Sequence, residues 1–284
     1  MSKIAFVTDS TAYIPKELCK AHNISVMPQL LIWGDQTYRD EVDIQPNEFY
    51  ARLKTAKVMP TTSQVPMLDM QQTFQQLIEK DFEVLGIFIS AKLSGTLQSA
   101  IQARETLGAA GGKISLVDSN TTAMAMGFII LAAARAAEQG ANVKECVALA
   151  EKAKEHVGVY FAMDTLEFLH RGGRIGGGTR FIGSALNLKP ILALKDGRVE
   201  AEDRVRTKSK AIDRILELVG EQVKGKSNIR VATLHANAED EARILLDRAT
   251  KEFNAIESIL SSVSPVVGVH AGPGTVGLAF MADI

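Results

Sequence analysis

Short apolar runs alternate with helical segments through the first half of the chain, and this alternation limits the possible folds more than any other feature. Apolar runs at 4–7, 84–89 and 113–117 alternate with segments of helical spacing that include 96–107 and 122–139. Strands that alternate with helices are typical of parallel sheets covered by helices. We therefore predict an α/β fold whose first part has a mainly parallel sheet flanked by helices.

The other expected elements of the first half follow from spacing and from prolines that open helices. Pro15 and Pro46 stand at positions typical of a first helical turn. Helices are predicted at 46–53, 67–80 and 143–155, and the run 26–33 is predicted to be one strand.

A two-residue turn changes the character of the second half. Asp196-Gly197 lies between two strand-like runs, and Asp-Gly is a strong signal for an antiparallel hairpin. The remaining segments predicted there are strands at 157–162, 229–234 and 276–281, and helices at 209–223 and 239–253. We predict a second α/β domain with a mixed sheet.

The length supports this division. A chain of 284 residues is long enough for about two domains. We place them at 1–155 and 156–284, because Gly140-Ala141-Asn142 interrupts the first series and a new strand starts at residue 157. A ligand is expected between or across the two domains.

The composition excludes several classes of protein. The 32 Lys and Arg residues balance 33 Asp and Glu residues, which disfavours nonspecific binding to nucleic acid. Cys19 and Cys146 are far apart and outside any zinc-ligand spacing, so we expect no metal and a reducing cytoplasmic location. The start of the chain lacks the apolar stretch of a signal peptide, and the tract 123–134 is shorter than the roughly 20 residues that span a bilayer.

Three polar clusters stand at the ends of apolar runs. They are Thr61-Thr62-Ser63-Gln64, Ser94-Gly95-Thr96 and His270-Ala271-Gly272-Pro273-Gly274. Hydroxyl and backbone N–H groups can donate to a carboxylate or phosphate, but they supply no strong acid or base. The clusters therefore indicate binding, and no catalytic residue is predicted. Ordinary helix capping is the alternative interpretation of the first cluster.

Two of these clusters occupy positions where ligands are often bound. Ser94 follows the run 84–89, at the expected carboxyl edge of the sheet, but its surroundings match neither a P-loop nor a Gly-x-Ser-x-Gly elbow. His270 falls at the end of a short helix opened by Ser264-Pro265, beside glycines that permit close approach of a ligand. We expect His270 to donate to a carboxylate, and a structural role is its alternative.

Two basic segments complete the set of candidates. The glycine-rich segment 169–178 contains Arg171 and Arg174, but it follows a helical pattern and not the strand that a dinucleotide site requires. The segment 204–210 places Arg206 at a helix start, where a cation does not complement the helix dipole. Both segments suit a phosphate or an anionic partner. The alternative for 169–178 is a helix-terminating turn with solvated charges, and a solvated basic face is as good an explanation of 204–210.

Taken in order along the chain, these motifs resemble those of the DegV family. The resemblance rests on seven short motifs: Thr8-Asp9-Ser10-Thr11, Pro60-Thr61-Thr62-Ser63-Gln64, Leu93-Ser94-Gly95-Thr96, Arg171-Gly172-Gly173-Arg174-Ile175-Gly176, Lys189-Pro190-Ile191, Val205-Arg206-Thr207-Lys208 and Gly268-Val269-His270. It covers essentially the whole chain. It implies a two-domain α/β protein that holds a long-chain fatty acid, and some members are the fatty-acid-binding subunit of bacterial fatty acid kinase.

The resemblance also implies roles for individual residues. Thr62, Ser94 and His270 would bind the fatty-acid carboxylate, with Thr61 and Ser63 as neighbours and Gly95 allowing close approach. Arg174 and Arg206 would lie where a separate ATP-binding kinase subunit docks. One departure is Val65, which separates Gln64 from Pro66 where family members commonly have proline directly after the glutamine.

The expected protein is thus a non-catalytic lipid carrier with a bound fatty acid and no other cofactor. It would use no nucleic acid and no stable membrane insertion, and its possible protein partner is the kinase subunit. Two alternatives stay open. One is a phosphotransferase that acts with its own nucleotide through the regions of Asp9 and Arg174, and the other is a regulatory module that senses lipid.

Overall fold

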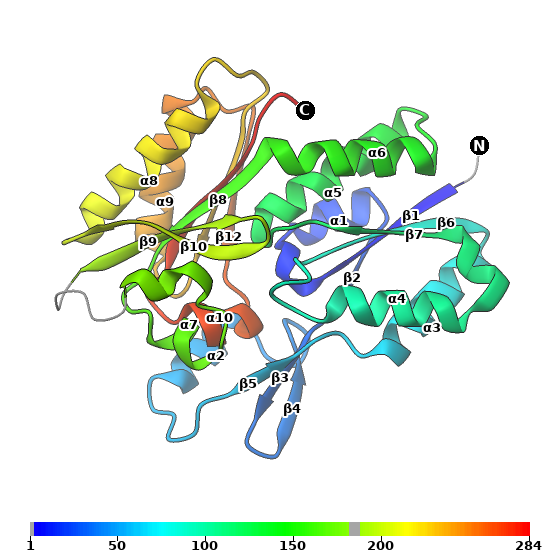
Figure 1. Cartoon of the computed structure of the whole chain (residues 1–284), viewed down its shortest axis with the longest axis horizontal. Helices are drawn as coiled ribbons and strands as arrows, with labels where there is room; N and C mark the ends of the chain where they lie inside the picture. Colours follow the sequence, from blue (N-terminus) through cyan, green and yellow to red (C-terminus); the bar gives the residue numbers. More distant parts are fainter. Residues whose placement is uncertain (1–2, 182–187) are drawn as a thin grey trace.

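A four-stranded sheet and a six-stranded sheet form the two sides of the molecule, and a three-stranded sheet lies at one end between them (Figure 1). This computed structural model describes residues 3–181 and 188–284. Helices cover the outer faces of the large sheets and also fill the space between them (Figure 1). The predicted α/β fold is confirmed, with one parallel and one mixed sheet.

The four-stranded sheet is parallel throughout, as the alternation of strands and helices predicts. Its strands, in spatial order, are β2 (Ile24–Met27), β1 (Lys3–Asp9), β6 (Phe82–Phe88) and β7 (Ile114–Asp118). The helices of this half are α1 (Lys16–Ala21), α3 (Met67–Glu79), α4 (Thr96–Thr106), α5 (Ala123–Glu138) and α6 (Val143–Ala153). Since β1, β6 and β7 run in parallel, the loops that follow them meet at one edge of the sheet.

The six-stranded sheet is mixed. Its spatial order is β10 (Arg198–Val205), β9 (Lys189–Lys195), β8 (Val157–Ala162), β13 (Val276–Met281), β11 (Arg230–His235) and β12 (Glu257–Ser262). The predicted hairpin joins β9 to β10, and Asp196 and Gly197 have φ angles of 48° and 75°, as a two-residue turn with positive φ requires. The helices α8 (Lys208–Val223) and α9 (Glu239–Glu252) pack against this sheet.

The small sheet corrects two expectations. It contains β4 (Gln36–Arg39), β3 (Leu30–Trp33) and β5 (Thr61–Ser63), which pair antiparallel. The run 26–33 is therefore not one strand, because Pro28, which lacks a ladder donor, separates β2 from β3. The segment from Thr61 to Ser63 is also a strand and not a helix cap, since α3 begins only at Met67.

Short helices connect these layers. They are α2 (Pro46–Leu53), α7 (Glu167–Arg171) and α10 (Pro265–Ala271), with the 3-10 turns η1 (Ser10–Ala12), η2 (Gly108–Lys113), η3 (Lys154–His156) and η4 (Gly176–Phe181). Helix α10 packs closely on α2, because a Cβ at Gly268 would lie 2.6 Å from the Tyr50 hydroxyl and 2.7 Å from the Phe49 ring. A side chain at position 268 would therefore push the two helices apart.

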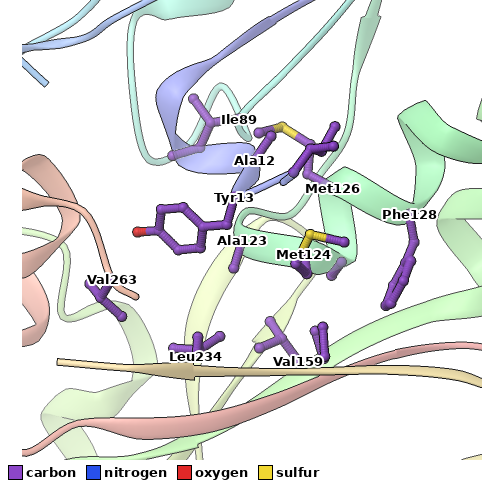
Figure 2. Packing of buried hydrophobic residues seen from close by; sticks show 14 of the residues in the cluster. Ala12, Tyr13, Ile89, Ala123, Met124, Met126, Phe128, Val159, Leu234 and Val263 are labelled. Carbon is purple, nitrogen blue, oxygen red and sulfur yellow. The ribbon is translucent and has the colours of Figure 1, made fainter. Parts of the chain in front are cut away.

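Helix α5 joins the two halves of the core. It packs on β1 and β6 of one sheet and on β8, β11 and β13 of the other. Figure 2 shows Met124 and Phe128 of α5 on the side of Val159 and Leu234, which belong to the second sheet. One hydrophobic cluster therefore includes residues from both halves. Because α5 packs on both large sheets, the hydrophobic core does not divide into two parts at residue 155. The domain boundary between residues 155 and 156 therefore stays a prediction.

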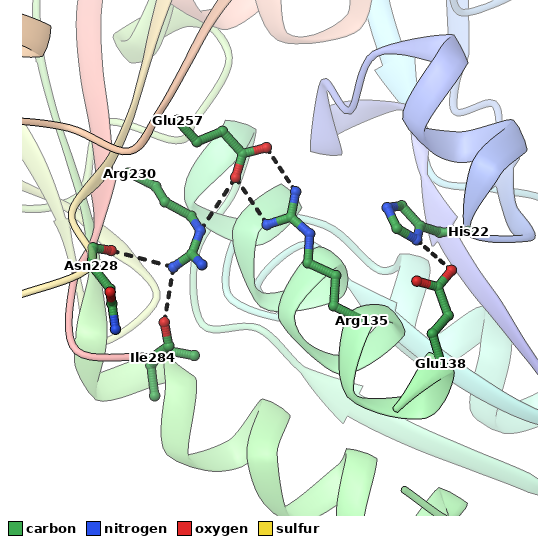
Figure 3. A network of polar contacts seen from close by, with 7 residues as sticks. All are labelled: His22, Arg135, Glu138, Asn228, Arg230, Glu257 and Ile284. Carbon is green, nitrogen blue, oxygen red and sulfur yellow. Dashed lines mark hydrogen bonds and ion pairs between the residues drawn. The ribbon is translucent and has the colours of Figure 1, made fainter. Parts of the chain in front are cut away.

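An ion-pair network closes the same interface at the end of α5 (Figure 3). Arg135 donates to both carboxylate oxygens of Glu257, over 2.9 and 2.7 Å, and Arg230 lies 3.2 Å from the same carboxylate. Burial raises the pKa of Glu257, but the hydrogen bonds and charges of the two arginines outweigh burial and lower it overall. Nearby, His22 contacts Glu138 over 2.7 Å.

We expect Glu257→Ala to destabilise the protein by about 2 kcal/mol, because two half-buried guanidinium groups lose their shared acceptor. Since the folded pKa of Glu257 is lowered, its contribution is present above its unfolded value and is lost as the pH falls through the folded value. Denaturant unfolding at pH 7 measures the loss. Glu252→Ala, at the exposed end of α9, is the control and should change stability little. Equal stability of both variants would contradict the prediction.

Candidate functional site

An apolar cavity of about 190 Å³ lies between the two large sheets. One side is formed by Tyr13, Ile89 and Ala123 of the first half, and the other by residues of the second sheet such as Val159 and Leu234. Figure 2 shows Tyr13, Leu234 and Val263 around the same space. The remaining apolar lining comes from Leu93, Phe161, Leu169, Leu194, Val199, Val266, Val267 and Ala271.

Polar residues line the same cavity, and they include most of the predicted site. The predicted residues found in the lining are Thr62, Ser63, Ser94, Gly95, Arg174 and His270. They come from β5, from the loop after β6, from the segment after α7 and from α10. Of the predicted residues, Thr61 and Arg206 are exposed and are not among the residues that line the cavity.

Thr62 and His270 are in direct contact although 208 positions separate them. The hydroxyl Oγ1 of Thr62 lies 2.9 Å from Nε2 of His270. Burial lowers the pKa of His270 to about 4, and the charge of Arg174 adds to this effect. The imidazole is therefore neutral at pH 7. When its Nε2–H donates to Thr62, the Thr62 hydroxyl keeps its own proton for a ligand oxygen.

Ser94 lies in a short hydroxyl network at the carboxyl edge of the parallel sheet. Its Oγ is 3.0 Å from Oγ1 of Thr96 and 3.4 Å from Oε1 of Gln29. Gly95 follows it where the chain passes very close to β5, because a Cβ at Gly95 would lie 2.7 Å from the side-chain oxygen of Gln64. The loop and the strand thus present their hydroxyls to the same end of the cavity.

Arg174 ties the second half of the chain to the Ser94 loop. Its Nε donates to the carbonyl oxygen of Leu93 over 3.1 Å, and its Nη1 donates to that of Gly172 over 2.8 Å. The hairpin tip makes similar contacts with this loop, since Ser90 donates to the carbonyl of Gly197 over 2.9 Å and Lys92 to that of Asp196 over 2.6 Å. The guanidinium of Arg174, which lines the cavity, therefore places a positive charge beside its polar end.

Gln29 is a cavity residue that the sequence motifs do not predict: it lines the cavity and is 3 % exposed. Its Nε2 donates to Oδ1 of Asp9 over 3.2 Å, so its oxygen faces Ser94. The available signal was a polar residue after Pro28, inside an otherwise apolar run. When such a residue is buried, its polar atoms need hydrogen-bond partners.

Comparison with known proteins assigns the family. The family model described as "Uncharacterised protein, DegV family" matches residues 3–283. The chain belongs to the DegV family. A DegV domain-containing protein of Clostridium perfringens is 36% identical over 282 residues, which are 99% of each chain. The family predicted from the seven motifs is therefore confirmed.

Two solved DegV structures show the same fold. A structure described as fatty acid binding of a DegV family protein from Thermus thermophilus has a TM-score of 0.93 and 34% identity, over 99% of both chains. A second, described as DegV, a fatty acid binding protein from Bacillus subtilis, has a TM-score of 0.90 and 33% identity, over 100% of both chains. The arrangement of the sheets around the cavity is thus that of DegV proteins.

Within residues 3–181 and 188–284, no helix is both long and apolar enough to cross a bilayer. The same ranges hold no group of three His, Cys, Asp or Glu side chains placed to bind a metal ion.

Proposed function

We propose that this DegV protein binds a long-chain fatty acid, with the acyl chain in the apolar part of the cavity and the carboxylate at Thr62, Ser94 and His270. The observation that carries the proposal is one apolar cavity whose polar end gathers hydroxyl donors from distant parts of the chain. The descriptions of the Thermus and Bacillus relatives as fatty acid binding support it.

The two parts of the cavity make different contributions to binding. Burying about 12–16 methylenes at roughly 0.8 kcal/mol each would supply on the order of 10 kcal/mol before ordering costs. A hydrogen bond to a charged acceptor contributes about 1.5–3 kcal/mol. The acyl chain therefore provides most of the affinity, and the hydroxyls select an acid and set its orientation. In this proposal Thr61 and Ser63 support β5 beside Thr62, and Gly95 lets the ligand approach.

We further propose that the bound carboxylate is presented to a separate ATP-binding kinase subunit, for which this protein is the non-catalytic partner. Arg174 lies at the polar end of the cavity and Arg206 is exposed on the second half, so both are offered as contacts for that subunit or for a phosphorylated product. We place the protein in the cytoplasm, which suits its two free thiols, Cys19 and Cys146.

Native mass spectrometry of the gently purified chain tests fatty-acid binding. We expect a bound mass that corresponds to a C14–C18 fatty acid, and uptake of oleate or palmitate after delipidation. A protein that carries no lipid and takes up neither acid would exclude the proposal. In a separate assay, acyl phosphate should form only when the kinase subunit and ATP are both added. ATP turnover by the purified chain alone would instead favour a phosphotransferase.

A further inference from the structure

Two buried carboxylates lie behind the polar end of the cavity. Asp9 is 0% exposed and Asp40 is 1% exposed. Asp40 accepts from the backbone N–H of Val266 over 3.0 Å through Oδ1, and from the Ser10 hydroxyl over 2.7 Å through Oδ2. Val266 lies in the first turn of α10, and His270 follows one turn later. Asp40 therefore holds the start of the helix that carries His270.

Asp9 makes the matching contact to the segment that carries Ser94. Its Oδ2 accepts from the backbone N–H of Ile89 over 2.9 Å, just before that loop begins. Gln29 joins the two acids. Its backbone N–H donates to Ser10 over 3.2 Å, its carbonyl accepts from the N–H of Asp40 over 2.9 Å, and its side chain donates to Asp9 over 3.2 Å. One buried network thus reaches both sides of the head-group site.

We propose that Asp40 is a positioning residue of the fatty-acid site, which anchors α10 so that His270 stays against Thr62. This inference rests on the proposed function. Asp40 does not line the cavity, and its influence on a ligand passes through α10. A hydrogen bond to an ionised acceptor is stronger than a neutral one, so the charge of Asp40 strengthens this anchor.

Other contacts of this segment are uncharged. The Tyr13 hydroxyl accepts from the N–H of Ser264 over 3.2 Å, and the Tyr50 hydroxyl donates to the carbonyl of Val263 over 3.2 Å. Both contacts lie before the helix, whereas Asp40 bonds to its first turn. Loss of the Asp40 charge should therefore loosen α10 without releasing the chain that precedes it.

The surroundings of Asp40 indicate when that charge is lost. Burial raises the pKa of Asp40 to about 6, the interactions with Ser10, Val266 and the Ser264 side chain oppose this, and the charge of Asp9 adds to it. The titratable groups around it are Asp9 on β1, Tyr13 after η1, Tyr50 on α2 and the adjacent Glu41, which itself faces Lys16. Burial raises the pKa of Glu41 to about 7, so Glu41 requires its own control.

Protonation of Asp40 should have opposite effects on fatty-acid binding and on the stability of the fold. Because the folded pKa of Asp40 lies above its unfolded value, protonation between about pH 6 and 4 favours the folded state. Mild acid should therefore weaken the hydrogen bond that anchors α10, while protonation of Asp40 does not destabilise the folded protein. His270, with a pKa of about 4, stays neutral through most of that range.

The test compares wild type with Asp40→Asn, which removes the charge at nearly constant shape. With palmitate as the ligand, we expect about threefold to tenfold weaker binding at pH 7.5 and a much smaller difference at pH 5. Because both proteins are measured with the same ligand at each pH, titration of the ligand's own carboxyl group cancels in the ratio of their affinities. Glu41→Gln is the control and should follow the wild-type pH profile. Equal binding by wild type and Asp40→Asn at pH 7.5 would overturn the inference.

A double-mutant cycle shows whether Asp40 acts through His270. In a His270→Ala background, Asp40→Asn should cause less than a twofold further loss, whereas a general structural role would give the full loss again. If Asp40→Asn fails to fold, palmitate affinity is measured against pH for wild type and for His270→Ala. Between pH 7.5 and 5 the affinity of wild type should fall more than that of His270→Ala. Equal falls in both proteins would overturn the inference. Wild-type protein that binds no fatty acid would overturn the proposed function itself.

Discussion

Replacing Leu194 by tryptophan is expected to abolish most fatty-acid binding. Leu194 lies on β9, is only partly buried and lines the cavity, so the larger indole can occupy space that the acyl chain needs. If the indole displaces about four methylenes, the loss is about 3 kcal/mol, which weakens binding on the order of 100-fold. Displacement of a fluorescent fatty acid by palmitate measures the change.

Leu260→Trp is the matched control for this prediction. Leu260 is also a partly buried leucine on a strand, but it packs against the other core of the second sheet, away from the cavity. We expect this variant to bind palmitate as the wild type does. Equal loss in both variants would show that tryptophan acts by disturbing the fold, and unchanged binding by Leu194→Trp would place the acyl chain elsewhere.

Removing two hydroxyls from the polar end is expected to remove the preference for an acid. The double variant Thr62→Val and Ser94→Ala keeps nearly the same shape but deletes two donors that line the cavity. Each hydrogen bond to a carboxylate contributes about 1.5–3 kcal/mol, so the loss of two should weaken palmitate binding at least about 100-fold. Hexadecanol, which has the same chain without the charge, should lose far less, and competition between the two ligands measures this.

A second double variant separates head-group binding from general stability. Thr233→Val and Ser99→Ala make the same chemical changes at buried positions on β11 and α4 that do not line the cavity. The Thr233 hydroxyl has no hydrogen-bond partner among the described residues, so its removal should be tolerated. This variant should keep its preference for the acid. An equal fall in palmitate and hexadecanol affinity for the cavity variant would argue against carboxylate recognition by Thr62 and Ser94.

Elements with a clear local pattern were predictable. The helix at 46–53 and the strands at 157–162 and 276–281 occur with the predicted bounds, and Asp196-Gly197 forms the expected hairpin turn. These signals arise from residues close together in sequence, such as proline in a first turn or apolar residues at regular spacing. The strand β12 has four polar residues among six, so its local pattern does not predict a strand, and its pairing with β11 depends on the finished sheet.

Pairings between distant segments produced the larger errors. The sequence pattern predicts one strand over 26–33, yet β2 joins the parallel sheet and β3 joins the small one. Thr61 and Thr62 are equivalent by residue type, and only the pairing of β5 with β3 in the folded protein decides which of them reaches the cavity. Thr62 lines the cavity and Thr61 is exposed, although both belong to one predicted cluster.

By itself the sequence determined the family, the α/β class and the residue types that can hold an oxygen-bearing group, because each of these depends on short motifs. Only the tertiary structure decided that Thr62 and His270 stand 2.9 Å apart, that Gln29 joins Ser94, and that Asp9 and Asp40 accept hydrogen bonds from the backbone of Ile89 and Val266. Such contacts depend on how α10 packs against β5 and α2, and burial across the whole core sets that packing.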